Sequence, residues 1–139
     1  MSFDNILDTI IGKDLDYKLI SPLVLAYIGD SIFDLLIKAK IIGTPMYHVN
    51  DIHKTVIKLV NAHSQSEMMH KIQELLTDEE RSVYKRGRNS RTVTPAKNQG
   101  ITDYRRATGF EALFGYLFLK KNWSRIQELF AICMAAEKE

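Results

Sequence analysis

Apolar side chains recur three and four residues apart along nearly the whole chain. One such run covers residues 3–11 and stops at Gly12, and a longer one begins after Ser21 and Pro22 and reaches about Ile42. This spacing puts apolar side chains on one face of a helix, proline is favoured in the first turn of a helix, and glycine often follows the last. We therefore expect a helix over each of these segments.

The same spacing continues through the second half of the chain. From about His48 to Leu76 it predicts one long helix, or two with a break near Ser64. Thr77 is the expected N-cap of a further helix, because acids fill its first turn and cations its last. Two more helices are expected from about Thr102 to Lys121 and from Trp123 to Met134. The predicted fold class is all-α, a helical bundle forming one domain over residues 1–139.

Positive charge is concentrated around one polar segment. Residues 87–100 have no apolar period and are expected to form a surface loop. Residues 81–106 hold eight cations and one acid, a net charge of +7, whereas the rest of the chain carries −5. Six of the eight are arginines, whose guanidinium groups bind phosphate oxygens through two N–H groups. The block indicates a nucleic-acid partner, and a solvated charged loop is the alternative.

Several classes of protein are disfavoured by the remaining composition. Cys133 is the only cysteine, so an internal disulfide is excluded, and we expect it to be buried. No apolar run is long enough to span a membrane and the first residues include early acids, which favours a cytoplasmic protein without a secretory signal. The spacing of His48, His53, His63 and His70 fits neither a helical zinc pair nor a zinc finger.

Two carboxylates stand in the most apolar helical stretches. Asp30 and Asp34 are the only charges in residues 20–37, and Glu111 is the only one in residues 107–119. An ionised carboxylate is costly to bury unless it is paired, hydrogen-bonded or bound to a metal. We therefore expect Asp30 and Glu111 to be buried and to converge on one cation.

Glycines near Glu111 offer a way to bring the two acids together. Gly109 and Gly115 would allow another backbone to approach, so that a second helix crossing there could place Asp30 beside Glu111. Mg²⁺ prefers oxygen ligands and can promote phosphodiester hydrolysis. With the basic block, this pattern favours a nuclease. A purely structural alternative remains, in which Asp30 bonds a helix N-terminus and Glu111 pairs with an arginine at 105–106.

Several stretches, in order, resemble the ribonuclease III family. LAYIGDSIFDLLI at 25–37 and TGFEALFGYLFL at 108–119 are similar to the two acidic motifs of that family. KRGRN at 85–89, KN at 97–98 and YRRATGFEALFGY at 104–116 resemble more closely its Mini-ribonuclease III group. The resemblance implies a homodimeric, Mg²⁺-dependent endoribonuclease that hydrolyses double-stranded RNA, leaves 5′-phosphate and 3′-hydroxyl ends, and matures the precursor of large-subunit (23S) ribosomal RNA.

Carried over by position, the resemblance makes Asp30 and Glu111 the catalytic residues and metal ligands. Ribonuclease III proper has further acids where this chain has Ala26 and Thr108, which leaves open whether one or two metal ions act. We expect no double-stranded-RNA-binding domain in this protein, so the catalytic domain and its dimer mate are expected to bind the RNA themselves. The expected RNA contacts are Arg86, Arg88, Asn89, Lys97, Asn98 and Arg105.

Three side chains and two other functions stay open at this stage. Tyr27 and Tyr104 either line the site or belong to the core, the latter being favoured. Asp34 either orients a metal-bound water or, as favoured, pairs with a lysine of the dimer mate. A non-catalytic RNA-binding or ribosome-assembly factor on the same scaffold is the main alternative, followed by a module that binds an acidic protein. Neither alternative explains Asp30 and Glu111, because a pure RNA binder has no use for two acids facing a polyanion.

Overall fold

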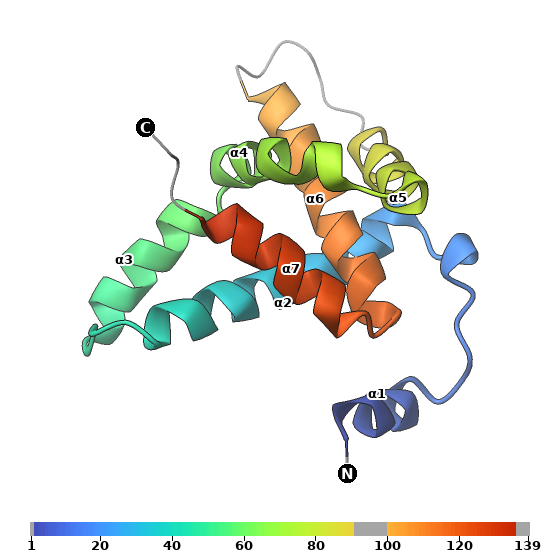
Figure 1. Ribbon diagram of the computed structural model, residues 1–139, viewed down its shortest axis with the longest axis horizontal. Helices are drawn as coiled ribbons and strands as arrows, with labels where there is room; N and C mark the ends of the chain where they lie inside the picture. The colour runs from blue at the N-terminus through green and yellow to red at the C-terminus, as the bar shows by residue number, and fades with distance from the viewer. Residues whose placement is uncertain (1, 91–99, 136–139) are drawn as a thin grey trace.

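The computed structural model describes residues 2–90 and 100–135, which are helical with no strand (Figure 1). The all-α prediction is confirmed. Lys97 and Asn98 lie outside the described residues. The α-helices are α1 (Phe3–Ile11), α2 (Pro22–Ile42), α3 (Val49–Val60), α4 (Ala62–Ile72), α5 (Asp78–Arg88), α6 (Ile101–Leu119) and α7 (Trp123–Met134), and two 3₁₀-helices cover Tyr17–Leu19 and Gln73–Leu75.

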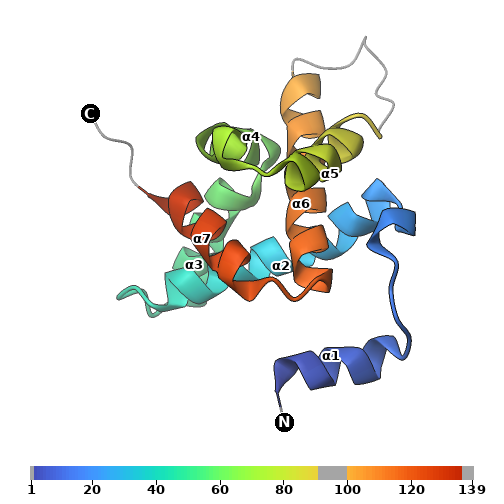
Figure 2. The same ribbon diagram turned by 45° about the vertical axis from the view of Figure 1, so that its right-hand side comes forward.

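The central element is α6, which crosses α2 and is covered by α4, α5 and α7 (Figures 1 and 2). From Ala107 to Phe118 every residue of α6 is buried except Glu111, which is half-buried. Phe110 and Phe114 pack against Phe33 of α2. Their ring centroids lie 5.1 Å and 5.8 Å, respectively, from the centroid of the Phe33 ring. A helix that is apolar all round belongs in the core, so the one acid in this stretch is conspicuous.

Two glycines let α2 and α6 touch backbone to backbone. A Cβ atom added to Gly29 would overlap the carbonyl oxygen of Glu111, and one added to Gly115 would overlap the carbonyl oxygen of Leu25. No side chain fits at either position, so these glycines fix the crossing point. The expected close approach at Gly115 is confirmed, whereas Gly109 lies against α5, where an added Cβ would come 2.6 Å from the Tyr84 carbonyl oxygen.

The boundary of the expected polar loop was wrong at its start. Gly87 belongs to α5, which continues to Arg88. A Cβ at Gly87 would lie 2.8 Å from the Ala112 Cβ and 3.0 Å from the Gly109 Cα. This glycine therefore serves close packing of α5 on α6 and does not mark a turn.

Polar side chains define the remaining helix ends. Thr77 accepts from the Glu80 N–H at 3.1 Å and its own N–H donates to Glu80 Oε1 at 2.9 Å, a capping box that confirms the predicted start of α5. The long third region is two helices broken at Asn61, three residues before the expected position. There the Asn61 side chain accepts from the Ser64 N–H at 2.9 Å and caps α4.

The terminal helices are joined to the core by specific polar contacts. The Arg125 guanidinium of α7 donates to both carboxylate oxygens of the buried Glu80 at 2.8 Å. The Trp123 indole N–H donates to Asp4 at 2.7 Å and links α1 to α7. The Phe3 ring also lies 6.2 Å from Phe118 and 5.6 Å from Trp123 between ring centroids, so α1 packs on one end of the bundle (Figures 1 and 2). None of the helices in the described ranges is long and apolar enough to cross a membrane.

Candidate active site

Asp30 and Glu111 belong to the two helices that cross at the centre of the fold. Gly29, the residue before Asp30, lies against the backbone of Glu111 itself. The two acids are therefore neighbours across the single crossing of α2 and α6, although they are far apart in sequence. Gly29 is the glycine at this backbone contact, and the convergence of the two carboxylates on one cation stays a prediction.

The expectation that both acids are buried was wrong. Asp30 is exposed and Glu111 is half-buried. The buried face of α2 carries Leu25, Gly29 and Phe33, and each residue turns the helix by about 100°, so Asp30 points away from that face. An exposed carboxylate avoids the cost of desolvation and is open to solvent, ions and substrate.

The outer face of α2 explains why the sequence pattern wrongly predicted that Asp30 is buried. Tyr27 is 82% exposed, and Val24 and Leu35 are also exposed, so apolar residues surround Asp30 without burying it. The side chain of Asp30 makes no hydrogen bond or ion pair with any residue that the structure describes, which removes the structural alternative of a helix-capping role. Asp34 pairs with Lys38 of its own helix at 2.7 Å, and its pairing with a dimer-mate lysine stays a prediction.

The donor set suits a hard cation. Two carboxylates from crossing helices provide oxygen ligands, and Mg²⁺ commonly takes one or two carboxylates while water or phosphate oxygens complete its shell. Ala26 and Thr108 are buried, and the Thr108 hydroxyl donates to the Tyr104 carbonyl oxygen at 3.0 Å. Over residues 2–90 and 100–135 no three acids, histidines or cysteines gather as a metal cluster.

The basic last turn of α5 packs on the part of α6 that carries Glu111. Gly87 contacts Ala112, the residue after Glu111, so Arg86 and Arg88 flank α6 at the level of Glu111. The Arg88 guanidinium lies 5.7 Å from the Tyr84 ring centroid, and its Nε donates to Asn89 at 3.3 Å.

Four of the six predicted RNA contacts fall in the described part of the chain. Arg86 and Asn89 are exposed on α5, and Arg88 and Arg105 are half-buried. The Nε of Arg105 is buried and has no hydrogen-bond partner among the described residues. Tyr104 is exposed at the start of α6, so neither it nor Tyr27 belongs to the core.

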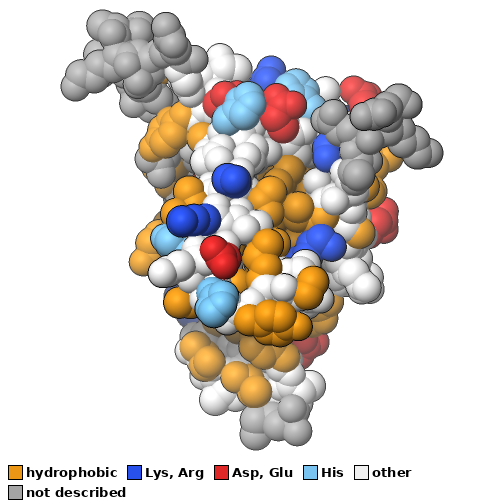
Figure 3. All heavy atoms as spheres, turned by 90° about the vertical axis from the view of Figure 1, so that its left-hand side faces the viewer, with side chains coloured by type: hydrophobic (Ala, Val, Ile, Leu, Met, Phe, Trp, Pro, Cys, Tyr) orange, Lys and Arg blue, Asp and Glu red, His pale blue; other side chains and the backbone are white. Residues whose placement is uncertain are grey.

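Two of the four histidines, His63 and His70, form contacts with α6. His63 Nδ1 lies 3.0 Å from Asp103 Oδ2, and this hydrogen bond raises the pKa of His63 and lowers that of Asp103. His70 Nε2 lies 2.7 Å from an Arg106 N–H group. Both contacts join α4 to the first turns of α6. Histidine side chains are spread among exposed hydrophobic ones on the face at the α3 end (Figure 3).

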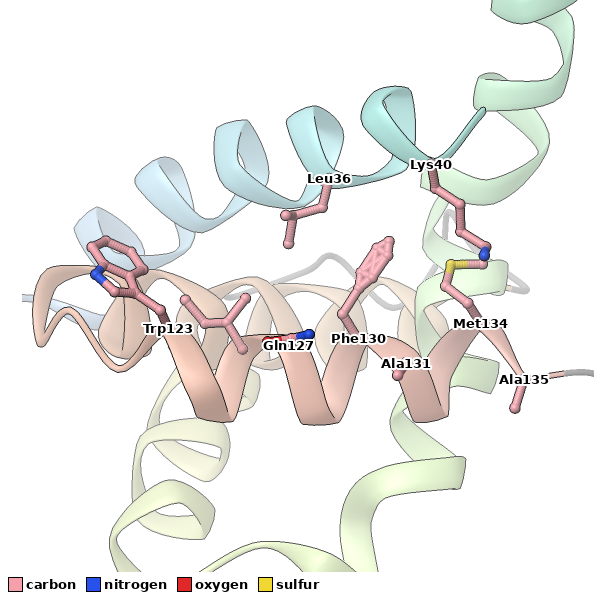
Figure 4. Close-up of a pocket in the computed structure, with 9 residues that line it drawn as sticks. Leu36, Lys40, Trp123, Gln127, Phe130, Ala131, Met134 and Ala135 are labelled. Carbon is pink, nitrogen blue, oxygen red and sulfur yellow. The ribbon is translucent and has the colours of Figure 1, made fainter. Parts of the chain in front are cut away.

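An apolar groove of about 600 Å³ lies elsewhere, between α2 and α7. Leu36 and Lys40 form one wall, and Trp123, Phe130 and Met134 lie along the other (Figure 4). No acid lines it, so it offers neither metal ligands nor a catalytic group. The crossing of α2 and α6 is therefore the better candidate for chemistry.

Comparison with known proteins gives a consistent result. Residues 23–122 match the family model described as Ribonuclease III domain. The Mini-ribonuclease 3 of Clostridium tetani is 43% identical over 125 residues, which are 89% of this chain and 83% of that protein. Those of Thermoanaerobacter sp. and Enterococcus faecalis are each 40% identical, covering 86% of this chain and 84% and 92% of their own lengths.

A solved structure agrees with the fold. The crystal structure of a protein from Fusobacterium nucleatum superposes with a TM-score of 0.75 at 30% identity, covering 86% of this chain and 95% of that one. The family match spans both Asp30 and Glu111. The chain therefore belongs to the ribonuclease III family of endoribonucleases, within the Mini-ribonuclease 3 group.

Proposed function

We propose that this chain is a Mg²⁺-dependent endoribonuclease of double-stranded RNA in which Asp30 and Glu111 are the catalytic residues and metal ligands. The observation that carries the proposal is the contact of Gly29 with the Glu111 backbone. It places an exposed acid beside the one residue of 107–118 that escapes full burial.

The two acids have complementary positions for this task. Asp30 and Glu111 would hold the ion, which when bound supplies Lewis-acid stabilisation of the charge developing on a phosphodiester. Glu111 is half-buried among the buried residues of α6, and we infer that this packing limits the positions its carboxylate can take. Asp30 is exposed, so a phosphate group can approach it. The proposed products carry 5′-phosphate and 3′-hydroxyl ends.

RNA binding is assigned to the basic block beside the acids. A-form RNA is recognised mainly through its shape and through phosphate and 2′-hydroxyl groups. Arg86, Arg88, Asn89 and Arg105 supply cationic and polar donors on α5 and α6, and Lys97 and Asn98 are proposed contacts outside the described residues. The cations also offset the repulsion between a polyanionic substrate and two carboxylates.

A homodimer is proposed through the outer face of α2. Val24, Tyr27, Leu35 and Ile42 are all exposed and follow one another at helical spacing along this face. Ser31 and Lys38 lie between them on the same face, and a surface with several exposed apolar residues is typical of an interaction site. A two-fold dimer would carry two equivalent sites, one for each antiparallel strand of a duplex. The similarity to Mini-ribonuclease 3 proteins favours a ribosomal RNA precursor as the substrate.

Incubation with a long end-labelled RNA duplex, with Mg²⁺ or with EDTA, tests the proposal. We expect fragments with 5′-phosphate ends only when Mg²⁺ is present, and none from single-stranded RNA of the same sequence. A duplex that is bound but stays intact under all conditions would instead support the non-catalytic RNA-binding alternative.

A further inference from the structure

The outer face of α5 borders a hollow of about 720 Å³ that the proposed chemistry does not use. Pro22, in the first turn of α2, closes one side, and Arg81, Lys85 and Arg86 of α5 line the other. A second hollow of about 480 Å³ lies on the opposite flank of α5 and is also lined by Arg81 and Lys85. These two cations thus form a ridge between two hollows.

The charges in the first hollow leave two cations available to a ligand. Asp78 is its only acid, and Arg81 lies 3.7 Å from that carboxylate and also donates to the carbonyl oxygens of Gln73 and Leu76. Lys85 and Arg86 are exposed, and within the described ranges neither side chain has a hydrogen bond or ion pair. The hollow therefore suits an anion.

Packing links this hollow to both acids through rigid elements. Pro22 and Asp30 lie on the same helix, eight residues or about 12 Å apart along its axis. Arg86 directly precedes Gly87, which packs against Ala112 beside Glu111. An anion held by Lys85 and Arg86 would thus sit at a fixed separation from the crossing of α2 and α6.

We propose that this hollow holds one backbone phosphate of the RNA duplex and thereby sets which phosphodiester bond reaches Asp30 and Glu111. The inference rests on the proposed function. Lys85 is the positioning residue, since its place on the ridge lets its ammonium group reach a phosphate on either side. Ser82 and Asn89, which also line the hollow, offer neutral donors for the same phosphate. Contacts to phosphate fix register on a duplex without reading sequence.

The test uses Lys85→Ala, with Lys58→Ala as the control because Lys58 is an exposed cation on α3, away from the hollow. Binding of a defined RNA duplex is measured at several salt concentrations in a Glu111→Gln background. Lys85→Ala should raise the dissociation constant roughly tenfold, the size of one charge-assisted contact. It should also lower the slope of log affinity against log salt by about one phosphate contact. Lys58→Ala should change neither.

Mapping of cut positions provides a second readout in the otherwise unaltered chain. Lys85→Ala should spread cleavage over neighbouring phosphodiester bonds, while Lys58→Ala should keep the original positions. An unchanged salt slope together with unchanged cut positions would overturn the proposal. If the salt slope falls but no form of the protein cleaves RNA, the hollow binds phosphate and it is the proposed function that fails.

Discussion

The carbonyl oxygen of Glu111 lies against Gly29, in the space that any side chain at position 29 would occupy. This contact determines both the crossing of the two central helices and the proximity of the two acids. The packing of α2 on α6 and the position of the candidate active site thus both depend on the contact between Gly29 and the Glu111 carbonyl group. A change at Gly29 should affect both.

Gly29→Ala should be severely destabilising. The added Cβ meets backbone rather than a flexible side chain, so α2 and α6 must separate, and we expect the free energy of unfolding to fall by about 3 kcal/mol or more. Urea denaturation followed by circular dichroism measures this. Gly100→Ala is the control, because no atom lies within 4 Å of a Cβ there, and its effect should stay within about 0.5 kcal/mol. Equal stability of the two variants would contradict the crossing.

The buried pair of Glu80 and Arg125 should matter far more than the exposed pair that Arg125 forms with Glu128. Arg125→Met leaves a buried carboxylate without its partner, and we expect a loss of about 3 kcal/mol. Glu128→Gln should cost at most about 0.5 kcal/mol. Thermal or urea unfolding of the two variants compares them, and similar losses would show that the link between α5 and α7 is not structural.

Stability should fall in acid because of Glu80. Burial raises its pKa, but the bonds from Arg125 and Thr77 outweigh burial and hold the pKa below 4.5, its ordinary value. As pH falls, Glu80 is therefore protonated in the unfolded chain before it is protonated in the folded one. Its contribution to the free energy of unfolding is complete above about pH 4.5 and is lost as pH drops through the pKa of Glu80 in the folded protein. Unfolding measured from pH 6 to 3 should show this loss, and Glu80→Gln should reduce the slope in that range.

His63 should titrate above its ordinary pKa of 6.5, because Asp103 stabilises the protonated ring. A raised pKa means that the contact stabilises the fold below pH 6.5 and that this contribution disappears as pH rises through the folded pKa. NMR titration of the His63 ring protons measures the midpoint. Asp103→Asn should lower it, whereas Asp51→Asn, a change at an exposed acid on α3, should not. A midpoint insensitive to Asp103 would refute the pairing.

The proposed dimer face is tested by Leu35→Glu, which puts charge into the exposed apolar row of α2. Sedimentation equilibrium of the unaltered chain should give about twice its 16.0 kDa mass, and the variant should be monomeric. Ile10→Lys removes a comparably exposed apolar residue from α1 and should remain dimeric. A monomeric parent chain, or two dimeric variants, would exclude this face.

Helical periodicity predicted most of the fold, because each helix presents an apolar face and its ends carry recognisable residues, as at Thr77 and Pro22. The exposure of Asp30 was not predictable in this way. An apolar face that is exposed at the surface cannot be distinguished in sequence from one that faces the core, and Tyr27 lies on an exposed face. The packing roles of Gly29 and Gly87 depend on which helices meet there, which local spacing does not encode.

Long-range polar pairs were equally hidden in the sequence. Nothing near Glu80 indicates Arg125 as its partner, and nothing near His63 indicates Asp103, because each pair forms only after distant helices pack. The two acids of the candidate site, in contrast, could be picked out from the sequence, because each interrupts an apolar run. This local pattern is visible in the sequence although neither acid is fully buried in the structure.

The most direct test of the account is single-turnover cleavage of an RNA duplex by Asp30→Asn and Glu111→Gln in Mg²⁺, with Asp51→Asn as the control. Both site variants should keep the fold and bind the duplex. Their cleavage should slow by roughly a thousandfold or more, which corresponds to about 4 kcal/mol of lost transition-state stabilisation. The control should cleave at the parent rate. Normal cleavage by either site variant would contradict the assignment of catalysis to the crossing of α2 and α6.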